Sequence, residues 1–400
     1  MELSQALKTT EVGSIPIDWD AVPLSQVCSM KSGEGIISGR IDAHSDYPCY
    51  GGNGLRGFTS RFTHDGTHAL VGRQGALCGN VLGVQGKFFA SEHALVVAAK
   101  DNTDIGWLTL VLGRMRLNRY SESSAQPGLS AAKLLRLAVA CPGSKAEQRA
   151  IAGVLSDADA LIESLEQLLA KKRHLKQGAM QELLTGKKRL PGFGLHDLEE
   201  TEVGLIPSDW LIRPLLSVVR IARGQVDPRV EPYRTMTLVA PDHIEVGTGR
   251  LLERVSAKDQ GAISGKYLFT RGDVVYSKIR PYLRKAALVD FDGLCSADMY
   301  PLRPSSDVSA GFVLATILGH RFSKYAESVS ARSGMPKINR EELAAFAVAL
   351  PPTKAEQDAI AAILSDMDSE IDAVVAKLTK ARQIKQGMMQ ELLTGRIRLV

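Results

Sequence analysis

Two stretches of the chain place apolar residues at alternating steps of three and four, which is the spacing of one face of a long helix. The first row runs over residues 151–179 and the second over 360–388. A flanking apolar row accompanies each, so the stripe is wider than a two-stranded coiled coil requires. Lys172 interrupts the first row, and Glu370 and Lys377 stand in the second. We expect the two helices to pair, with helices of a partner covering the rest of the stripe.

Local signals mark where each helix begins and ends. A capping box opens each one, at Ser144–Glu147 and at Thr353–Glu356. In this motif the hydroxyl accepts from the backbone N–H three residues on, while the glutamate reaches back to the cap. Gly186 and Gly395 suit the position just beyond a helix C-terminus. About 41 residues separate these signals, which corresponds to roughly 60 Å of helix.

The chain repeats itself once. The segment TEVGSIPIDW at 10–19 returns as TEVGLIPSDW at 201–210, and 26 of the 45 residues in 146–190 are identical in 355–399. The regions between these blocks barely match: 20–123 and 211–332. A duplicated unit with a constant frame and a diverged middle explains this pattern, whereas a solenoid would need shorter and more numerous repeats.

Chain order predicts how the two helices run. The first helix ends before the second diverged region and the second helix begins after it, so a compact region brings these ends together and makes the helices antiparallel. The first copy of the ten-residue block follows no helix. We expect it to lie at the end of the second helix, as its twin follows the first, which gives an internal pseudo-twofold axis. The alternative is that each helix packs only on its own domain.

The diverged regions have the composition of short strands separated by glycine. THALVGRQG resembles GDVVYSKIR, and FFASEHALVV resembles LCSADMYPL. We predict an α+β fold in which two globular heads of one type are joined by two long antiparallel helices that form a coiled coil. The expected domains are the first head with the N-terminal repeated segment at 1–141, the central helix and linker at 142–200, the second head at 201–350 and the C-terminal helix at 351–400.

The charge of the chain is concentrated. The 400 residues carry 49 basic and 44 acidic side chains, a net charge of +5 that permits a nucleic-acid partner without demanding one. Residues 266–285 alone hold six basic side chains and one acidic one, with three tyrosines between them. Arginine near tyrosine on loops suits phosphate binding and base readout, although a solvated basic face is the plainer interpretation. Two diverged heads on a rigid spacer favour a reader of two DNA half-sites.

No motif in the sequence predicts catalysis. GAISGKY departs from a phosphate-binding Walker loop in its spacing and its last residue. His64 and His68 stand four residues apart without a third ligand, so we expect no metal site. Five widely spaced cysteines without a CxxC pair fit a reducing cytosol. The longest uncharged apolar stretch, 311–319, is far shorter than the ~20 residues that cross a bilayer. We therefore expect a cytoplasmic protein without a membrane span.

The order of these motifs resembles a known family. TEVG-IP-DW, a diverged domain, a P…AEQ-AIA-VLSD-D helix and LKQG-MQELLTGK-RL, all in duplicate, are similar to the specificity subunit of type I restriction–modification systems. The similarity covers nearly the whole chain, and SKIRPYLRKA resembles the target-recognition domains of this family. The resemblance implies that each head is a target-recognition domain that reads one half of a split, asymmetric site in double-stranded DNA, with the helices fixing the gap.

The same resemblance implies the partners and the cofactors. The chain itself is expected to be neither an enzyme nor the holder of a cofactor. Two methyltransferase subunits are expected to dock on it and to methylate adenine with S-adenosylmethionine. Restriction subunits, which are translocases, are expected to join the complex and to use ATP and Mg²⁺.

Residue type and loop placement select the candidate DNA contacts. In the first head they are Tyr50, Asn53, Arg56, Arg73, Gln74 and Gln126. In the second head they are Lys278, Arg280, Tyr282, Arg284, Arg332, Lys337 and Arg340. Gln126 and Lys337, beside prolines 127 and 336, are expected to contact the DNA backbone or the methyltransferase. The apolar rows predict the helix and subunit interface: Ile151, Leu155, Leu161, Leu165, Leu168, Ile363, Leu364, Ile371, Val374 and Leu378.

Two alternatives stay open at this point. The chain can serve a methyltransferase–nuclease fusion or an orphan methylation complex, which neighbouring genes would distinguish. It can also be an adaptor of a different class, with a coiled coil and two protein-binding heads that read no DNA. Binding to DNA in the presence of the methyltransferase separates the adaptor from the specificity subunit.

Overall fold

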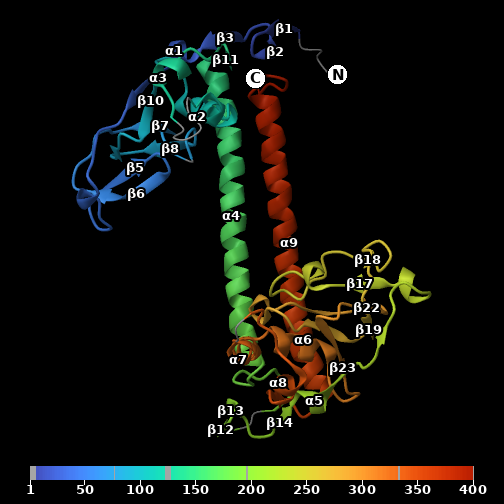
Figure 1. The fold of residues 1–400 in the computed structure, drawn as a ribbon. Helices are drawn as coiled ribbons and strands as arrows, with labels where there is room; N and C mark the ends of the chain where they lie inside the picture. Colours follow the sequence, from blue (N-terminus) through green and yellow to red (C-terminus); the bar gives the residue numbers. More distant parts are fainter. Residues whose placement is uncertain (1–5, 76, 122–127, 195–196, 332–333, 400) are drawn as a thin grey trace. The chain divides into compact units, whose positions relative to one another are not determined.

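The computed structural model describes residues 6–75, 77–121, 128–194, 197–331 and 334–399. The chain divides into two compact units. Unit 1 consists of Met1–Glu166 and Lys377–Val400, and unit 2 of Gln167–Ala376. Each unit therefore combines one head with a part of each long helix (Figure 1).

The two long helices are α4 (Lys145–Leu183) and α9 (Lys354–Leu392), each of 39 residues. The hydroxyl half of each predicted capping box is confirmed. Ser144 Oγ accepts from the N–H of Glu147 at 3.2 Å, and Thr353 Oγ1 accepts from the N–H of Glu356 at 3.3 Å. The predicted ends are confirmed as well, because glycines 186 and 395 adopt φ of +68° and +70°, a region that favours glycine.

Within unit 1, ion pairs fix the direction in which the two helices run. Glu166 of α4 accepts from Arg382 of α9 at 2.5 Å. Asp159, about two turns earlier in α4, pairs with Lys385, which lies later in α9. The partner's number rises as the α4 number falls. The predicted antiparallel pairing is therefore confirmed in this unit.

Unit 2 shows the same direction in its own segments of the helices. Lys172 pairs with Glu370 at 2.6 Å, and Lys176 pairs with Asp368 at 2.5 Å. Lys172 and Glu370 are two of the three charged residues that interrupt the predicted apolar rows. These two charged residues thus form an ion pair between the helices, in which each side chain compensates the charge of the other.

Head 1 is built on a four-stranded antiparallel sheet. Its strands, in spatial order, are β4 (Cys28–Ser32), β10 (Ala94–Ala99), β7 (Thr67–Gly72) and β8 (Val81–Gln85). A smaller sheet contains β6 (Gly54–Thr59), β5 (Tyr47–Gly51) and β9 (Phe89–Ala90), with β5 and β9 parallel. Helix α2 (Ile105–Arg114) packs on the larger sheet, and its Trp107, Leu108 and Leu112 are buried in the core of the unit.

Head 2 repeats this plan. Its four-stranded sheet has the order β15 (Val219–Ile221), β23 (Met299–Pro304), β20 (Val274–Ser277) and β21 (Ala286–Leu288). The second sheet contains β16 (Gln225–Val226), β19 (Lys266–Phe269), β22 (Gly293–Cys295), β17 (Thr237–Val239) and β18 (Val255–Ser256), with β17 and β22 parallel. Helices α6 (Ala310–Leu318) and α7 (His320–Ser330) follow. The predicted α+β fold with two heads of one type is confirmed.

The repeated frame supplies the remaining elements, which come in matching pairs. Hairpin β1 (Leu7–Thr10) with β2 (Gly13–Pro16) matches β12 (Leu198–Thr201) with β13 (Gly204–Pro207). Strand β3 (Asp20–Pro23) pairs with β11 (Ala138–Cys141), as β14 (Leu211–Pro214) pairs with β24 (Ala347–Leu350). The short helices are α1 (Leu24–Val27), α3 (Ala131–Leu134), α5 (Leu215–Val218) and α8 (Arg340–Ala344).

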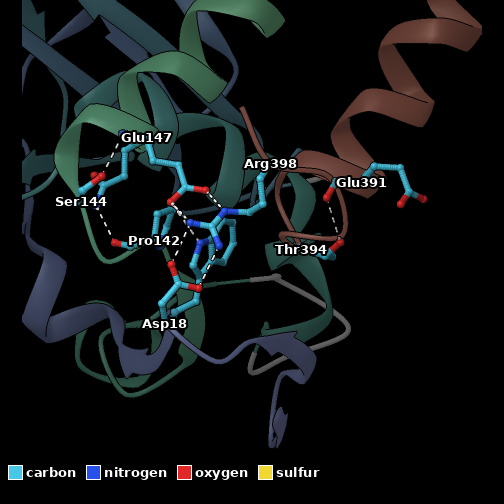
Figure 2. A network of polar contacts seen from close by, with 9 residues as sticks. Asp18, Pro142, Ser144, Glu147, Glu391, Thr394 and Arg398 are labelled. Atoms are coloured by element: carbon cyan, nitrogen blue, oxygen red, sulfur yellow. Dashed lines mark hydrogen bonds and ion pairs between the residues drawn. The ribbon is translucent and has the colours of Figure 1, made fainter. Parts of the chain in front are cut away.

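An arginine after the end of α9 ties the start of the chain to both long helices of unit 1 (Figure 2). Arg398 donates to both carboxylate oxygens of Asp18, at 2.8 Å each, and pairs with both oxygens of Glu147 at the start of α4. These hydrogen bonds lower the pKa of Asp18. The second oxygen of Glu147 also accepts from Trp19 Nε1 at 3.3 Å. The first ten-residue block therefore lies at the end of the second helix, as predicted.

Unit 2 contains an equivalent arginine that binds two carboxylates. Arg189, after the end of α4, donates to Glu356 through Nε and Nη2 at 2.8 Å each, and to Asp209 at 2.8 and 2.9 Å. In both units the glutamate of the predicted capping box is thus bound by an arginine that follows the other long helix, with both carboxylate oxygens engaged. The prediction that this glutamate reaches back to its own cap is wrong, because a bidentate charged partner is stronger than a neutral backbone N–H.

The glutamine of the repeated AEQ motif fastens each head to its helix. Gln148 Oε1 accepts from the N–H of Asp104, the N-cap of α2, at 2.7 Å, and Gln357 Oε1 accepts from the N–H of Ser309, the N-cap of α6, at 2.8 Å. Both glutamines are about 98–99% buried. The repeated glutamate and glutamine of the AEQ motif therefore make the same structural contacts in each unit.

We expect Gly186→Ala to destabilise unit 2 by about 1–3 kcal/mol more than Gly192→Ala. A Cβ at Gly186 would lie 2.4 Å from Cδ of Pro207, whereas a Cβ at Gly192 would meet nothing within 4 Å. Both glycines have a positive φ, +68° and +95°, so the control also places an alanine in a strained backbone conformation. Urea unfolding of the two variants measures the difference. Equal midpoints would show that the contact with Pro207 adds nothing.

Candidate nucleic-acid interface

In head 1 the loop that follows β7 contacts the loop that precedes β10. The N–H of Arg73 donates to the carbonyl of His93 at 2.8 Å, and the Arg73 guanidinium donates to Ser32 Oγ at 3.1 Å. The side chains of Gln74 and His93 meet at 2.9 Å between Oε1 and Nδ1. Since an amide oxygen only accepts, Nδ1 of His93 is the donor. This bond holds the exposed Gln74 amide in one orientation.

The other described candidates of head 1 gather beside this loop pair. The carbonyl of Tyr50 accepts from the N–H of Ser91 at 2.8 Å. Gly52 lies so close that an added Cβ would stand 3.0 Å from the His93 carbonyl and 3.1 Å from that of Gln74. Asn53 is exposed in the turn that follows it. The long side chain of Arg56 lies across Gly51, where a Cβ would clash with it.

In head 2 the equivalent loops make the equivalent contacts. The N–H of Lys278 donates to the carbonyl of Asp298 at 2.9 Å, as that of Arg73 donates to His93. The carbonyl of Lys278 accepts from Ile338 as that of Arg73 accepts from Leu129, at 2.9 Å in both cases. The similarity seen between the diverged sequences therefore reflects the same local structure. We name these surfaces the reading loops: residues 73–75 and 91–93 with 128–129 in head 1, and 278–284 and 296–298 with 336–338 in head 2.

Two arginines in strained backbone conformations frame the second reading loop. Arg280 and Arg284 flank the turn Pro281–Leu283 with φ of +49° and +46°, which is unusual for residues other than glycine. The N–H of Arg280 donates to the carbonyl of Pro336 at 2.8 Å, and Lys337 bridges to the neighbouring Ile279. Arg280 and Lys337 are exposed, and Tyr282 is 51% exposed. The surrounding contacts thus hold a basic, aromatic loop in an energetically unfavourable backbone conformation. Such conformations are typical of binding sites.

Three other predicted DNA contacts, Lys278, Arg284 and Arg340, lie close to other groups of the protein. The ammonium of Lys278 donates to the Ala297 carbonyl at 2.6 Å and lies 5.4 Å from the centre of the Tyr300 ring, which Arg340 approaches from 5.8 Å. Arg284 lines a cavity of about 720 Å³ between head 2 and the helices of unit 2. Gln126 and Arg332 lie outside the described residues.

Sequence reasoning missed residues on the second loop of each pair, namely Ser91 and His93 in head 1 and Asp298 in head 2. The signal was present, because FFASEHALVV and LCSADMYPL had been matched as equivalent blocks. These loops place polar groups directly beside the basic ones, as His93 does for Gln74.

The helix-interface candidates divide into buried and exposed groups. Ile151 and Leu155 are in the core of unit 1, Leu364 is in the core of unit 2, and Val374 and Leu378 are buried. Leu165 and Ile371 are half-buried. Leu161 is 54% exposed, Leu168 40% and Ile363 36%.

The part of the chain that the structure describes offers little evidence of a metal site or a membrane span. There, no three side chains of His, Cys, Asp or Glu gather as a metal site, and no helix is long and apolar enough to cross a membrane. The rings of His64 and His68 lie 5.6 Å apart, and burial lowers the pKa of His64. All five cysteines are free thiols, and burial raises the pKa of Cys28 to about 12.

Comparison with protein families decides the classification. The model of the type I restriction modification DNA specificity domain matches residues 16–171 and 207–382, one copy for each half of the chain. The chain belongs to this family. Type I restriction enzyme specificity subunits from Escherichia coli are similar to it: that of EcoDI is 26% identical over 96% of this chain and 89% of its own length. That of EcoprrI is 42% identical over 36% of this chain and 37% of its own length.

Solved structures share the fold. A type I restriction–modification S subunit from M. genitalium matches with a TM-score of 0.66 and 15% identity, over 98% of this chain and 99% of that one. A second chain, from a study of complex assembly and conformational transition of the type I R-M system, matches with a TM-score of 0.52 and 14% identity, over 96% and 99%. At these identities the similarity concerns the fold alone.

Proposed function

We propose that this specificity-family protein reads double-stranded DNA with its two heads, one half of a split site for each head. The observation that carries the proposal is the pair of equivalent reading loops. They have the same backbone contacts, yet one presents Arg73 and Gln74 and the other presents Arg280 and Lys337. A constant scaffold with different polar side chains at its surface is what two different half-sites require, because base edges are distinguished by donor and acceptor patterns.

In this proposal the chain is the non-catalytic member of a complex. Methyltransferase subunits bring S-adenosylmethionine, and restriction subunits bring ATP and Mg²⁺. Support comes from the family, whose description is DNA specificity, and from the similar chain studied for assembly of a type I R-M system. The target base is flipped into a pocket of the methyltransferase, so the reading loops need only recognise the flanking sequence.

The long helices are proposed to carry the docking surface for the methyltransferase. Within unit 2, Leu168 and Leu175 stand seven residues apart on α4 and are 40% and 53% exposed. Exposed leucines at this spacing form the seam that a partner helix covers.

The proposal is tested by Arg280→Ala in the complete complex with the methyltransferase. We expect a loss of about 1–3 kcal/mol that falls on one base position, if Arg280 makes a paired contact to guanine. Binding is measured on duplexes in which each position of the recognised site is varied in turn, and methylated adenines are mapped across the genome of the host. Arg271→Ala, an exposed arginine on another turn of the same head, is the control.

The outcomes of this test are distinct. A uniform loss on all sequences, with a smaller salt dependence, assigns Arg280 to a phosphate. Unchanged binding and unchanged methylation contradict its assignment as a DNA contact. Failure of the wild-type complex to bind DNA at all would favour the protein-binding adaptor.

A further inference from the structure

We propose that each unit carries an equivalent basic pocket that binds an acidic segment of a protein partner present in two copies. This inference rests on the proposed function, under which that partner is the methyltransferase subunit. The residues that line the pockets differ from those of the reading loops and from the exposed leucines of α4.

In unit 1 the pocket has a volume of about 470 Å³ and lies between the β1–β2 hairpin, the end of α2 and strand β11. Arg116, Arg119 and Tyr120 line one side, and Glu11 of the hairpin turn lines another. The Arg119 guanidinium stacks 4.7 Å from the centre of the Tyr120 ring and donates to its hydroxyl. Arg116 has φ of +49°, a strained conformation for a residue with a side chain.

In unit 2 the pocket has a volume of about 600 Å³ and lies between the β12–β13 hairpin, α7 and strand β24. Arg321, Lys324, Tyr325 and Glu202 line it. Arg321 lies 4.6 Å from the centre of the Phe346 ring and donates to the carbonyl of Ala347. Burial lowers its pKa more than the charge of Glu202 raises it. A half-buried guanidinium of this kind gains from an anionic ligand, because a carboxylate restores the charge compensation that burial removes.

The two pockets are built from corresponding residues. MRLNRY at 115–120 matches HRFSKY at 320–325 at an offset of 205, so Arg116 corresponds to Arg321, Arg119 to Lys324 and Tyr120 to Tyr325. The hairpin turns correspond as well, Glu11 to Glu202. This agreement falls inside the regions that otherwise barely match. The two heads therefore share a basic feature that readout of different DNA sequences does not demand.

The hairpin turns supply an independent argument. Thr10 Oγ1 donates to the Gly13 carbonyl at 2.8 Å, and Gly13 has φ of +106°, so these two residues are needed for the turn. Thr201 and Gly204 repeat both features. The glutamate between them is exposed in each unit and lines the pocket. The turn does not need this residue, whereas a pocket that binds a peptide can use it to accept a backbone N–H.

A protein suits these pockets better than DNA does. Each is a hollow beside a hairpin that exposes a leucine at the same position, Leu7 at 50% and Leu198 at 45%. Exposed apolar groups next to arginines fit an acidic peptide with an apolar anchor, because arginine and aromatic residues are enriched in protein interfaces. The phosphates of a DNA duplex lie on a convex surface and provide no apolar group that could contact the leucines.

The charged side chains that line the pockets indicate the chemical class of the ligand. Arg114, Arg116 and Arg119 face Glu11 in unit 1, and Arg321 and Lys324 face Glu202 in unit 2, so both pockets are net positive. A guanidinium beside an aromatic ring binds a carboxylate in a defined geometry. Each unit carries one such pocket, so the chain offers one equivalent site to each of the two methyltransferase copies that the family resemblance implies.

The test is the stoichiometry of the full-length chain with its methyltransferase subunit, measured by native mass spectrometry. We expect two methyltransferase copies on the wild-type chain, one on Arg119→Glu or Lys324→Glu, and none on the double variant. We also expect at least a tenfold weaker affinity for the copy that is lost. Arg119→Lys keeps the charge and should retain two copies. Arg40→Glu and Lys258→Glu, exposed sites outside the pockets, are the matched controls.

Other stoichiometries overturn the pocket proposal, and a DNA-binding measurement separates its failure from that of the proposed function. Two copies on all variants would show that the pockets do not hold the partner. Two copies with weaker DNA binding and a smaller salt dependence would assign the pockets to phosphates. Base-specific DNA binding by the assembled variants, read at the position that Arg280 governs, shows that the proposed function holds even where the pocket proposal fails. A wild-type chain that binds no methyltransferase would remove both.

Discussion

We expect Glu356→Gln to lower the free energy of unfolding of unit 2 by about 3 kcal/mol, the lower end of the cost of breaking a buried ion pair. Glu356 is 1% exposed and accepts two hydrogen bonds from Arg189, whose side chain is 6% exposed. Glutamine keeps one acceptor but removes the charge. The cost stays at the lower end because Asp209 still pairs with the arginine.

Urea unfolding followed by tryptophan fluorescence and circular dichroism measures this change. Trp210 lies in unit 2, whereas Trp19 and Trp107 lie in unit 1, so Trp19→Phe and Trp107→Phe in the background leave a signal from unit 2 alone. Glu341→Gln, an exposed acid of the same unit, should stay within about 0.5 kcal/mol of the wild type. Arg189→Met added to Glu356→Gln should recover part of the loss. A midpoint for Glu356→Gln equal to that of the wild type would contradict a role of this pair in stability.

The long helices could be predicted because their signals are local and occur twice. The apolar spacing, the hydroxyl caps at Ser144 and Thr353 and the two glycines past the ends all lie within a few residues of what they determine. The direction of the helices followed from chain order. The position of the first ten-residue block followed from the repeat, because its twin showed what that block packs against.

The role of the repeated glutamates could not be predicted from nearby sequence. A glutamate three residues after a serine has a local partner, and the motif names that partner. Glu147 instead binds an arginine 251 residues away. Such a contact forms because the antiparallel helices bring the end of one to the start of the other. Only the folded chain shows that this partner is available.

For the reading loops, residue type indicated segments that lie together in each head, but not the direction of each side chain. Arg73 and Lys278 occupy equivalent positions, yet one guanidinium reaches Ser32 and the other residue's ammonium turns to the carbonyl of Ala297. His93 was passed over because a lone histidine carries little information until Gln74 is seen beside it. The paired basic pockets were missed because their residues repeat at an offset of 205, which differs from both offsets of the frame.

The second large effect is expected on the α4 surface. Leu168→Glu with Leu175→Glu should weaken binding of the methyltransferase subunit by at least about 100-fold, or close to 3 kcal/mol. Fully burying a leucine is worth about 1.5–3 kcal/mol. Leu168 and Leu175 are 40% and 53% exposed in the free chain, so covering each with a partner is worth about 1 kcal/mol. A glutamate in the same place also brings a charge into the covered seam, which costs further unless it is paired.

The same exposure means that the double variant should fold normally, since neither leucine belongs to a core of its unit. Leu252→Glu, 53% exposed on head 2, is the matched control and should bind the methyltransferase as the wild type does. Titration of the full-length chain with the methyltransferase subunit gives the affinity, and urea unfolding confirms that the stability is unchanged. An affinity within about threefold of the control would show that the docking surface lies elsewhere. A docking surface that loses two leucines buried in the complex cannot retain its binding free energy.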